Sequence, residues 1–154
     1  MPLASFASAP LPSINVAVPI TCHVAVWFWA AQEAQARGLT GAKAPESTLR
    51  RIAAMPGGPQ NAMLALPTSG NVVLGPGAFL PAPGSVLRWT SGATHSAVVT
   101  GVDSIAGYNQ GQQFVGAGMG RTVRRSADVH PAHTAVSIIL ETTIVNAAGV
   151  VFNL

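Results

Sequence analysis

Residues 83–110 constrain the fold most, because they place three apolar runs of strand length in succession with only brief turns between them. The runs cover 86–89, 97–102 and 105–108. Turn residues separate them, with Gly92 in the first gap and Asp103 in the second. Connections this short cannot hold a crossover helix, so we expect three consecutive antiparallel strands.

The sequence before these strands favours helices. Residues 22–37 carry apolar side chains at helical spacing between Thr21, a good N-cap, and Gly38, a typical terminating glycine. A second helix is predicted over 45–55, where a proline occupies the first position, and a short one is predicted over 60–66.

The chain ends are predicted to be extended. The prolines of residues 1–19 predict an extended N-terminal arm, with an edge strand over 15–18 as one option. The β-branched residues of 134–145 predict a strand that forms a hairpin with 150–152. Further predictions are a crossing loop over 67–84 with a strand at 72–74, a glycine-rich turn or lid over 111–120, and a strand over 121–123. Helices followed by mostly antiparallel strands indicate one α+β domain over residues 1–154.

The composition excludes several classes of protein. One cysteine rules out an internal disulfide, and no apolar run approaches the ~20 residues that span a bilayer, so we expect no membrane insertion. The net charge is only +3, and the arginine clusters at 50–51 and 121–125 are not interleaved with aromatic residues, which argues against nucleic acid as a partner. Residues 1–20 contain no lysine or arginine, so a cleaved secretory signal is not expected.

Cys22 is the first candidate for chemistry. It follows the N-cap Thr21, so it lies in the first turn of the predicted helix, where unpaired N–H groups and the helix dipole favour a thiolate over a thiol. Its own backbone N–H is placed to donate to a developing oxyanion. The commoner role of a lone cysteine is that of a small buried apolar residue.

His95 is the candidate base, because it opens the middle strand of the predicted sheet and its ring would lie at the rim, within reach of a helix tip. A solvent-facing turn histidine is the plainer interpretation. Counting along the strands makes Asn109 the residue that orients the imidazole, with Gln110 as the alternate if the register slips by one. Asp103 and Asp128 are further options for that role.

The other histidines are not expected to take part. His23 is displaced by about 100° around the helix from Cys22, which directs it away from the predicted cleft. His130 and His133 have the spacing of a metal pair, but Pro131 interrupts a helix there and no further ligands complete a tetrahedral site. We therefore expect neither a metal nor a cofactor.

Two segments carry a resemblance to a known family. The sequence Pro-Gly-Ser-Val-Leu-Arg-Trp at 83–89, followed by Thr-His-Ser-Ala-Val-Val-Thr-Gly-Val at 94–102, resembles the NlpC and CHAP branch of the papain-like cysteine hydrolases. Ser85 stands where that family has aspartate, and His23 stands where it has serine after the cysteine. The resemblance implies a papain-like α+β fold, in which an N-terminal helix carrying the cysteine packs on a small antiparallel sheet carrying the histidine. It also implies that Cys22 is the nucleophile, His95 the base and Asn109 the orienting residue.

The same resemblance implies a function. Members of the family cleave amide bonds of peptidoglycan, and compact relatives are secreted bacterial effectors, including type VI amidase toxins. The expectation is therefore a thiol amidase or peptidase, made in a bacterial cytoplasm without a cleaved signal peptide and delivered into a target cell. Its partners would be peptidoglycan or a protein substrate, and an immunity or carrier protein. The alternatives are a deamidase that modifies glutamine or asparagine of a host or rival-cell protein, and a non-catalytic papain-like binding module.

Overall fold

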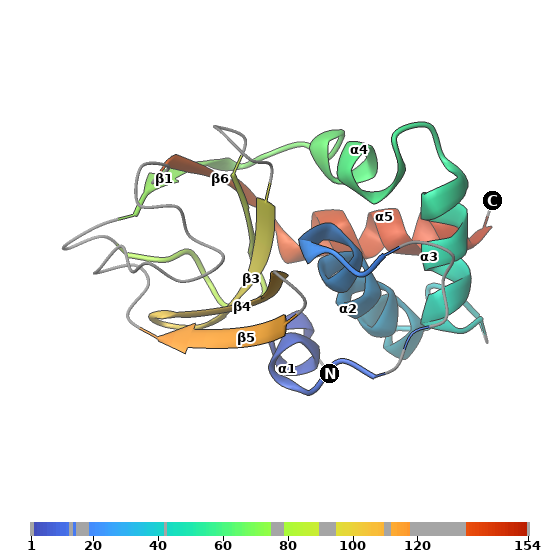
Figure 1. The fold of residues 1–154 in the computed structure, drawn as a ribbon, viewed down its shortest axis with the longest axis horizontal. Coiled ribbons are helices and arrows are strands. Elements are labelled where there is room, and N and C mark those ends of the chain that lie inside the picture. Colours follow the sequence, from blue (N-terminus) through green and yellow to red (C-terminus); the bar gives the residue numbers. More distant parts are fainter. Residues whose placement is uncertain are drawn as a thin grey trace.

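The structure is a computed structural model that describes residues 2–12, 14, 19–41, 43–74, 79–89, 95–109, 112–117 and 135–153. Helices and strands separate into two halves, with the sheet on one side and most of the helices on the other (Figure 1). The elements are α1 Leu3–Ser8, α2 Cys22–Ala36, α3 Pro45–Ala54, α4 Gly58–Leu64, β1 Gly70–Val73, β2 Val86–Trp89, β3 His95–Gly101, β4 Ser104–Asn109, β5 Gln112–Ala117, β6 Ala135–Ile139 and α5 Glu141–Asn153.

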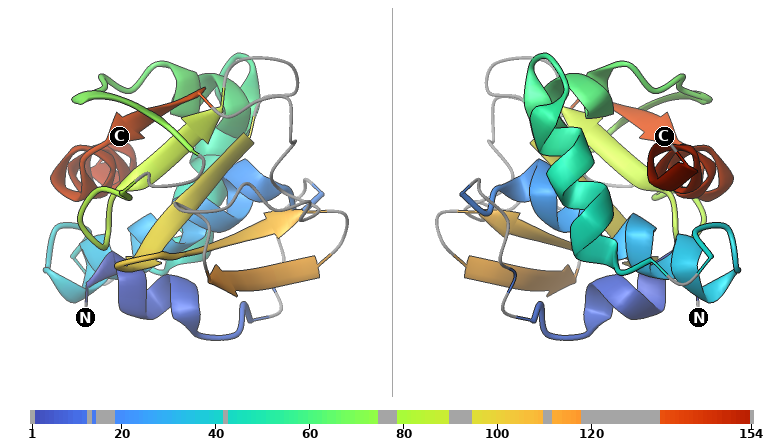
Figure 2. Two further views of the ribbon diagram at one scale, coloured as in Figure 1. Left: turned by 90° about the vertical axis from the view of Figure 1, so that its left-hand side faces the viewer. Right: turned by 90° about the vertical axis from the view of Figure 1, so that its right-hand side faces the viewer.

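The sheet has six strands in the order β1-β6-β2-β3-β4-β5, and every pair is antiparallel. Strands β2, β3 and β4 are consecutive neighbours, which confirms the three-strand prediction. Strand β6 returns from far along the chain to lie between β1 and β2. The strands change direction markedly across the sheet, as Figure 2 shows. The fold class is α+β, as the sequence predicts.

Each face of the sheet packs against its own apolar core, because successive side chains of a strand point to opposite faces. Val86, Val98 and Ala106 lie in the core shared with the helices. Leu87, Trp89, Ala97, Val99 and Ile105 lie in a second, smaller core on the other face. Both faces of β2 and β3 are therefore buried.

Helix α2 is the centre of the helical half. It confirms the prediction for 22–37, ending with Ala36 ahead of Gly38, which adopts a φ of 76°. It contacts α1, α3, α4 and α5 as well as β3 and β4. Its side chains are buried almost without interruption from His23 to Ala34, which is wider than the apolar stripe expected from the sequence. A helix that is buried all round forms the core of a domain rather than its surface.

The prediction of an extended arm over 1–19 is wrong for its first part. Residues Leu3–Ser8 form helix α1, which packs on α2 and β3 and buries Leu3 and Ala7 completely. The small residues of this segment let it lie close to the neighbouring elements. The optional edge strand at 15–18 lies outside the described residues.

The hairpin predicted for the C-terminus is also wrong. Only Ala135–Ile139 is a strand, and Glu141–Asn153 forms helix α5. Its residues Ile144, Val145, Ala148 and Val151 recur at helical spacing and are buried beside α2. Tertiary packing thus overrides the strand preference of β-branched residues.

The glycine-rich segment 111–120 was expected to be a turn or lid, but residues Gln112–Ala117 form strand β5, paired with β4 along six residues of each strand. The predictions for 45–55, 60–66 and 72–74 are confirmed, with shifted ends, as α3, α4 and β1. The strand predicted at 121–123 lies outside the described residues.

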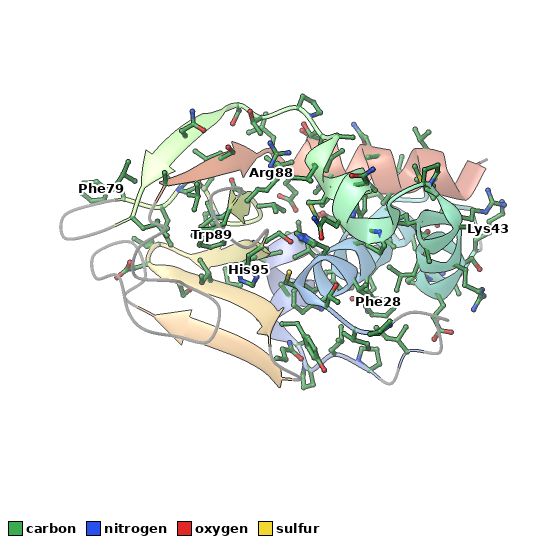
Figure 3. All side chains as sticks on the ribbon, turned by 45° about the horizontal axis from the view of Figure 1, so that its top comes forward. Phe28, Lys43, Phe79, Arg88, Trp89 and His95 are labelled. Carbon is green, nitrogen blue, oxygen red and sulfur yellow. The ribbon has the colours of Figure 1, made fainter. Side chains whose placement is uncertain are left out.

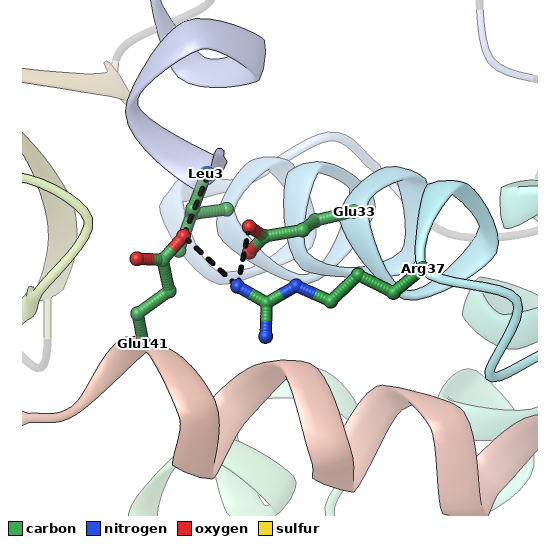
Figure 4. A network of polar contacts seen from close by, with 4 residues as sticks. All are labelled: Leu3, Glu33, Arg37 and Glu141. Atoms are coloured by element: carbon green, nitrogen blue, oxygen red, sulfur yellow. Dashed lines mark hydrogen bonds and ion pairs between the residues drawn. The ribbon is translucent and has the colours of Figure 1, made fainter. Parts of the chain in front are cut away.

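A network of charged groups joins helices α1, α2 and α5 (Figure 4). Nη2 of Arg37 lies 2.8 Å from Oε1 of the buried Glu33 and 3.7 Å from Oε2 of Glu141. The same Oε2 accepts a hydrogen bond of 2.8 Å from the backbone N–H of Leu3. Glu141 therefore anchors the first turn of α1 to the rest of the domain.

The absence of a side chain at Gly84 leaves room for the Glu141 carboxylate. The φ of Gly84 is 95°, and a Cβ at this position would overlap the Glu141 carboxylate. We expect Gly84→Ala to lower the free energy of unfolding by about 2 kcal/mol or more, because it adds backbone strain and displaces Glu141 from Leu3 and Arg37. Urea denaturation measures this change.

Gly41→Ala is the matched control for Gly84→Ala. Gly41 also has a positive φ, 62°, but nothing lies within 4 Å of the added Cβ. Gly41→Ala should lower the free energy of unfolding only through backbone strain, by about 1 kcal/mol. Equal losses in the two variants would contradict the assigned contact with Glu141.

The pH dependence of stability reports on Glu33. Burial, followed by the hydrogen bond and the charge of Glu141, raises the pKa of Glu33 from its usual 4.5 to about 7, against the opposing effect of Arg37. Because the raised pKa favours the protonated form in the folded state, the stabilisation is complete below about pH 4.5 and is lost as the pH rises through about 7. The free energy of unfolding should fall by on the order of 2 kcal/mol over that range.

Glu33→Gln should flatten this profile, because the amide stays neutral at every pH. Glu46→Gln, on helix α3 and outside the network, should leave it unchanged. A wild-type profile that stays flat between pH 5 and 8 would contradict the raised pKa of Glu33.

Candidate active site

Cys22 is the first residue of helix α2. Thr21 caps the helix, and its hydroxyl accepts a hydrogen bond of 3.4 Å from the backbone N–H of Val24. The side chain is partly exposed. Helix α2 contacts strands β3 and β4 as well as the other helices, so it joins the two halves of the molecule (Figure 1).

The Cys22 sulfur contacts the start of strand β3. The backbone N–H groups of Ser96, His23 and Cys22 itself lie close enough to the sulfur to lower the pKa of the thiol. Ser96 directly follows His95 in the sequence. Folding thus brings the thiol to the backbone of the residue beside the candidate base, from a position more than 70 residues earlier in the chain.

Burial raises the pKa of the Cys22 thiol, and the three N–H groups oppose this change without cancelling it. The expectation that the helix N-terminus would favour a thiolate is therefore not met. Removal from water destabilises the thiolate by more than the N–H groups stabilise it, because a charged group loses more hydration free energy on burial than a neutral one.

His95 opens strand β3 and is buried, with 6% of its surface exposed. It pairs with Trp89 of the neighbouring strand β2, and the two ring centroids lie 5.1 Å apart at an interplanar angle of 46°. Figure 3 shows the His95 side chain beside Trp89, between the strands and helix α2. The indole restricts the imidazole, so the histidine is not the solvent-facing turn residue of the plainer interpretation.

Asn109 is the last residue of β4, the neighbour of β3. Val98 pairs with Ala106, and counting three residues outward from this pair along each strand leads to His95 and Asn109. The paired residues of β3 and β4 end at Val98 and Ala106, so His95 and Asn109 lie beyond the paired part of the hairpin, at the same end of it. Asp103 lies in the turn at the other end of β3, about 20 Å away along the strand, so it does not orient His95. Gln110 and Asp128 lie outside the described residues.

His23, which the sequence analysis directs away from the predicted cleft, lies against the start of β3. It is buried, and its Nδ1 lies 2.9 Å from Oγ of Ser96. The 100° offset from Cys22 does not direct it away from the site, because sheet and helices surround the first turn of α2. Its position directly after the cysteine, in place of the family's serine, was the signal available in the sequence.

No group of three or more histidine, cysteine, aspartate or glutamate residues within the described ranges is placed to hold a metal ion. His130 and His133 fall outside those ranges. Among the helices that the structure describes, none is long and apolar enough to cross a bilayer.

Two described surface hollows lie away from Cys22. One, of about 300 Å³, is lined by Arg51, Ala54, Met55 and Val151, and the other, of about 210 Å³, by Leu39, Asn146, Gly149 and Val150. Both lie on the helical half.

Comparison of the chain with protein-family models, with curated proteins and with solved structures found no match. Functional inference therefore rests on the site itself.

The raised pKa of Cys22 is directly measurable, because this is the only thiol of the chain. The rate of alkylation by iodoacetamide should rise with pH with a midpoint above the ~8.5 of a free thiol. Mass spectrometry of the alkylated protein gives the rates.

The same measurement in urea provides the control, since unfolding exposes the sulfur and removes its N–H donors. The midpoint should then return to the ordinary value. A folded protein with a midpoint near or below pH 7 would contradict the dominance of burial.

Proposed function

We propose that this protein is a cysteine hydrolase of papain-like layout that cleaves amide bonds, with Cys22 as nucleophile and His95 as base. The observation that carries the proposal is the contact between the Cys22 sulfur and the backbone N–H of Ser96, the residue next to His95. The helix with the cysteine and the strand with the histidine come from distant parts of the sequence, and both begin at this contact.

Because burial raises the pKa of the Cys22 thiol, we infer activation by a general base rather than a preformed thiolate–imidazolium pair. The proposed reaction requires the His95 ring, which rests beside Trp89, to turn toward the Cys22 sulfur. There it removes the thiol proton as the sulfur attacks the substrate carbonyl, and a C–S bond forms. The backbone N–H of Cys22 donates to the oxyanion. His95 returns the proton to the leaving amine as the C–N bond breaks, and water then hydrolyses the thioester to a carboxylate.

The third residue of the proposed site is Asn109. What supports this choice is that Asn109 ends β4 at the end of the hairpin where β3 begins with His95, whereas Asp103 lies in the turn at the other end. An amide at this position would fix the imidazole tautomer by accepting or donating one hydrogen bond.

The substrate class follows from the resemblance of residues 83–102 to the NlpC and CHAP branch. We infer that the substrate is a peptide amide of peptidoglycan, and that the protein is a bacterial effector delivered into a target cell. An immunity or carrier protein is the partner that this function would require.

A second candidate function is a non-catalytic papain-like binding module. One observation favours it: burial raises the pKa of the Cys22 thiol, as is usual for an inert buried cysteine. In that case the cysteine and His95 would serve only packing.

Incubation with purified peptidoglycan tests the proposal. The wild-type protein should release amide-cleavage products, which liquid chromatography and mass spectrometry identify. Cys22→Ala should abolish release, and His95→Gln should reduce the rate by about 100-fold or more, because each removes a group that transfers the proton or forms the bond. Asn109→Ala should reduce it less.

Asp103→Asn is the matched control, since it changes the same hairpin at the end away from His95. It should leave the rate unchanged. Hydrolysis that persists in Cys22→Ala would overturn the proposed role of the thiol. Failure to cleave peptidoglycan, with an uncut protein target gaining the mass of deamidation, would replace the substrate by a protein glutamine or asparagine.

A further inference from the structure

A hydrogen bond between two buried polar side chains joins the first turn of α2 to the start of β3. Nδ1 of His23 lies 2.9 Å from Oγ of Ser96. Their exposed fractions are 4% and 0%. Neither side chain is accessible to a substrate, so any effect on chemistry must pass through a neighbouring group.

That neighbouring group is Cys22. Ser96 bonds to His23 through its hydroxyl, and its backbone N–H lies near the Cys22 sulfur, where it lowers the pKa of the thiol. His23 follows Cys22 in the chain, and its own backbone N–H acts on the same sulfur in the same way. The three residues therefore close a ring of contacts, in which the side-chain bond fixes the distance between helix and strand.

We propose that His23 and Ser96 are positioning residues, whose side-chain hydrogen bond holds the backbone N–H of Ser96, and with it the start of β3, against the Cys22 sulfur. The inference rests on the proposed function, in which this sulfur becomes charged during the reaction. Without the bond, a small shift of the first residues of β3 would take the backbone N–H of Ser96 away from the sulfur.

A purely structural role is the alternative. Buried polar groups are generally hydrogen-bonded, and such a bond stabilises the fold wherever it lies. The two roles differ in one respect. A positioning pair changes the protonation of Cys22, whereas a structural pair changes only the resistance to unfolding.

The pH profile of Cys22 alkylation by iodoacetamide distinguishes them in the full chain. His23→Leu removes the bond and keeps an apolar side chain of similar volume, and Ser96→Ala removes the hydroxyl and keeps the backbone N–H. Each should raise the midpoint by about half a unit, equivalent to alkylation about threefold slower at pH values below the midpoint. The double variant should show the shift of one single variant, because the pair acts as a unit.

Two further variants sharpen the result. His23→Asn places an amide near the position of Nδ1 and should restore much of the wild-type profile. Thr48→Val removes another buried hydroxyl, on helix α3, which does not contact β3 closely, and should leave the profile unchanged.

Unchanged midpoints in folded His23→Leu and Ser96→Ala would overturn the proposal, as would additive shifts in the double variant. Unfolding of Ser96→Ala would also overturn it, because the pair would then be a stability element. The amidase assay tests the proposed function separately. If the midpoints shift but the wild type does not cleave peptidoglycan, the positioning pair stands and the proposed substrate falls. If the wild type cleaves peptidoglycan but the midpoints do not shift, the proposed function stands and the positioning pair falls.

Discussion

The contact between the first turn of helix α2 and the first residues of strand β3 is the constraint on which the rest of the structure depends. There the Cys22 sulfur meets the backbone of Ser96, and His23 bonds to the Ser96 hydroxyl. On the other side of the strand, His95 lies against Trp89. A displacement of either element would separate all of these groups at once, so their relative position is fixed by packing as well as by hydrogen bonds.

That packing comes from the central position of α2. The helix is enclosed by four other helices and two strands, so it cannot slide without opening the main core. Glu33, near its end, belongs to the network in which Arg37 and Glu141 hold α1 and α5. Apolar burial thus fixes one end of α2 and a charged network the other, which keeps the sulfur at a defined place.

Two opposing effects act on the sulfur at that place. Burial disfavours the thiolate, and three backbone N–H groups favour it, with burial the larger effect. This balance explains why a helix N-terminus alone does not predict an activated cysteine: the geometry of the donors and the degree of burial both depend on what packs around the first turn.

The sequence by itself determined the α+β class, the limits of α2 and the β2–β3–β4 meander, because these depend on local signals: the Thr21 cap, the Gly38 terminus and short alternating runs. Only the tertiary structure decided that residues 3–8 and 141–153 are helical, since their partners Glu141, Gly84 and α2 are distant in sequence. It alone placed His23 on Ser96 and set the balance on Cys22, because burial is a property of the assembled chain.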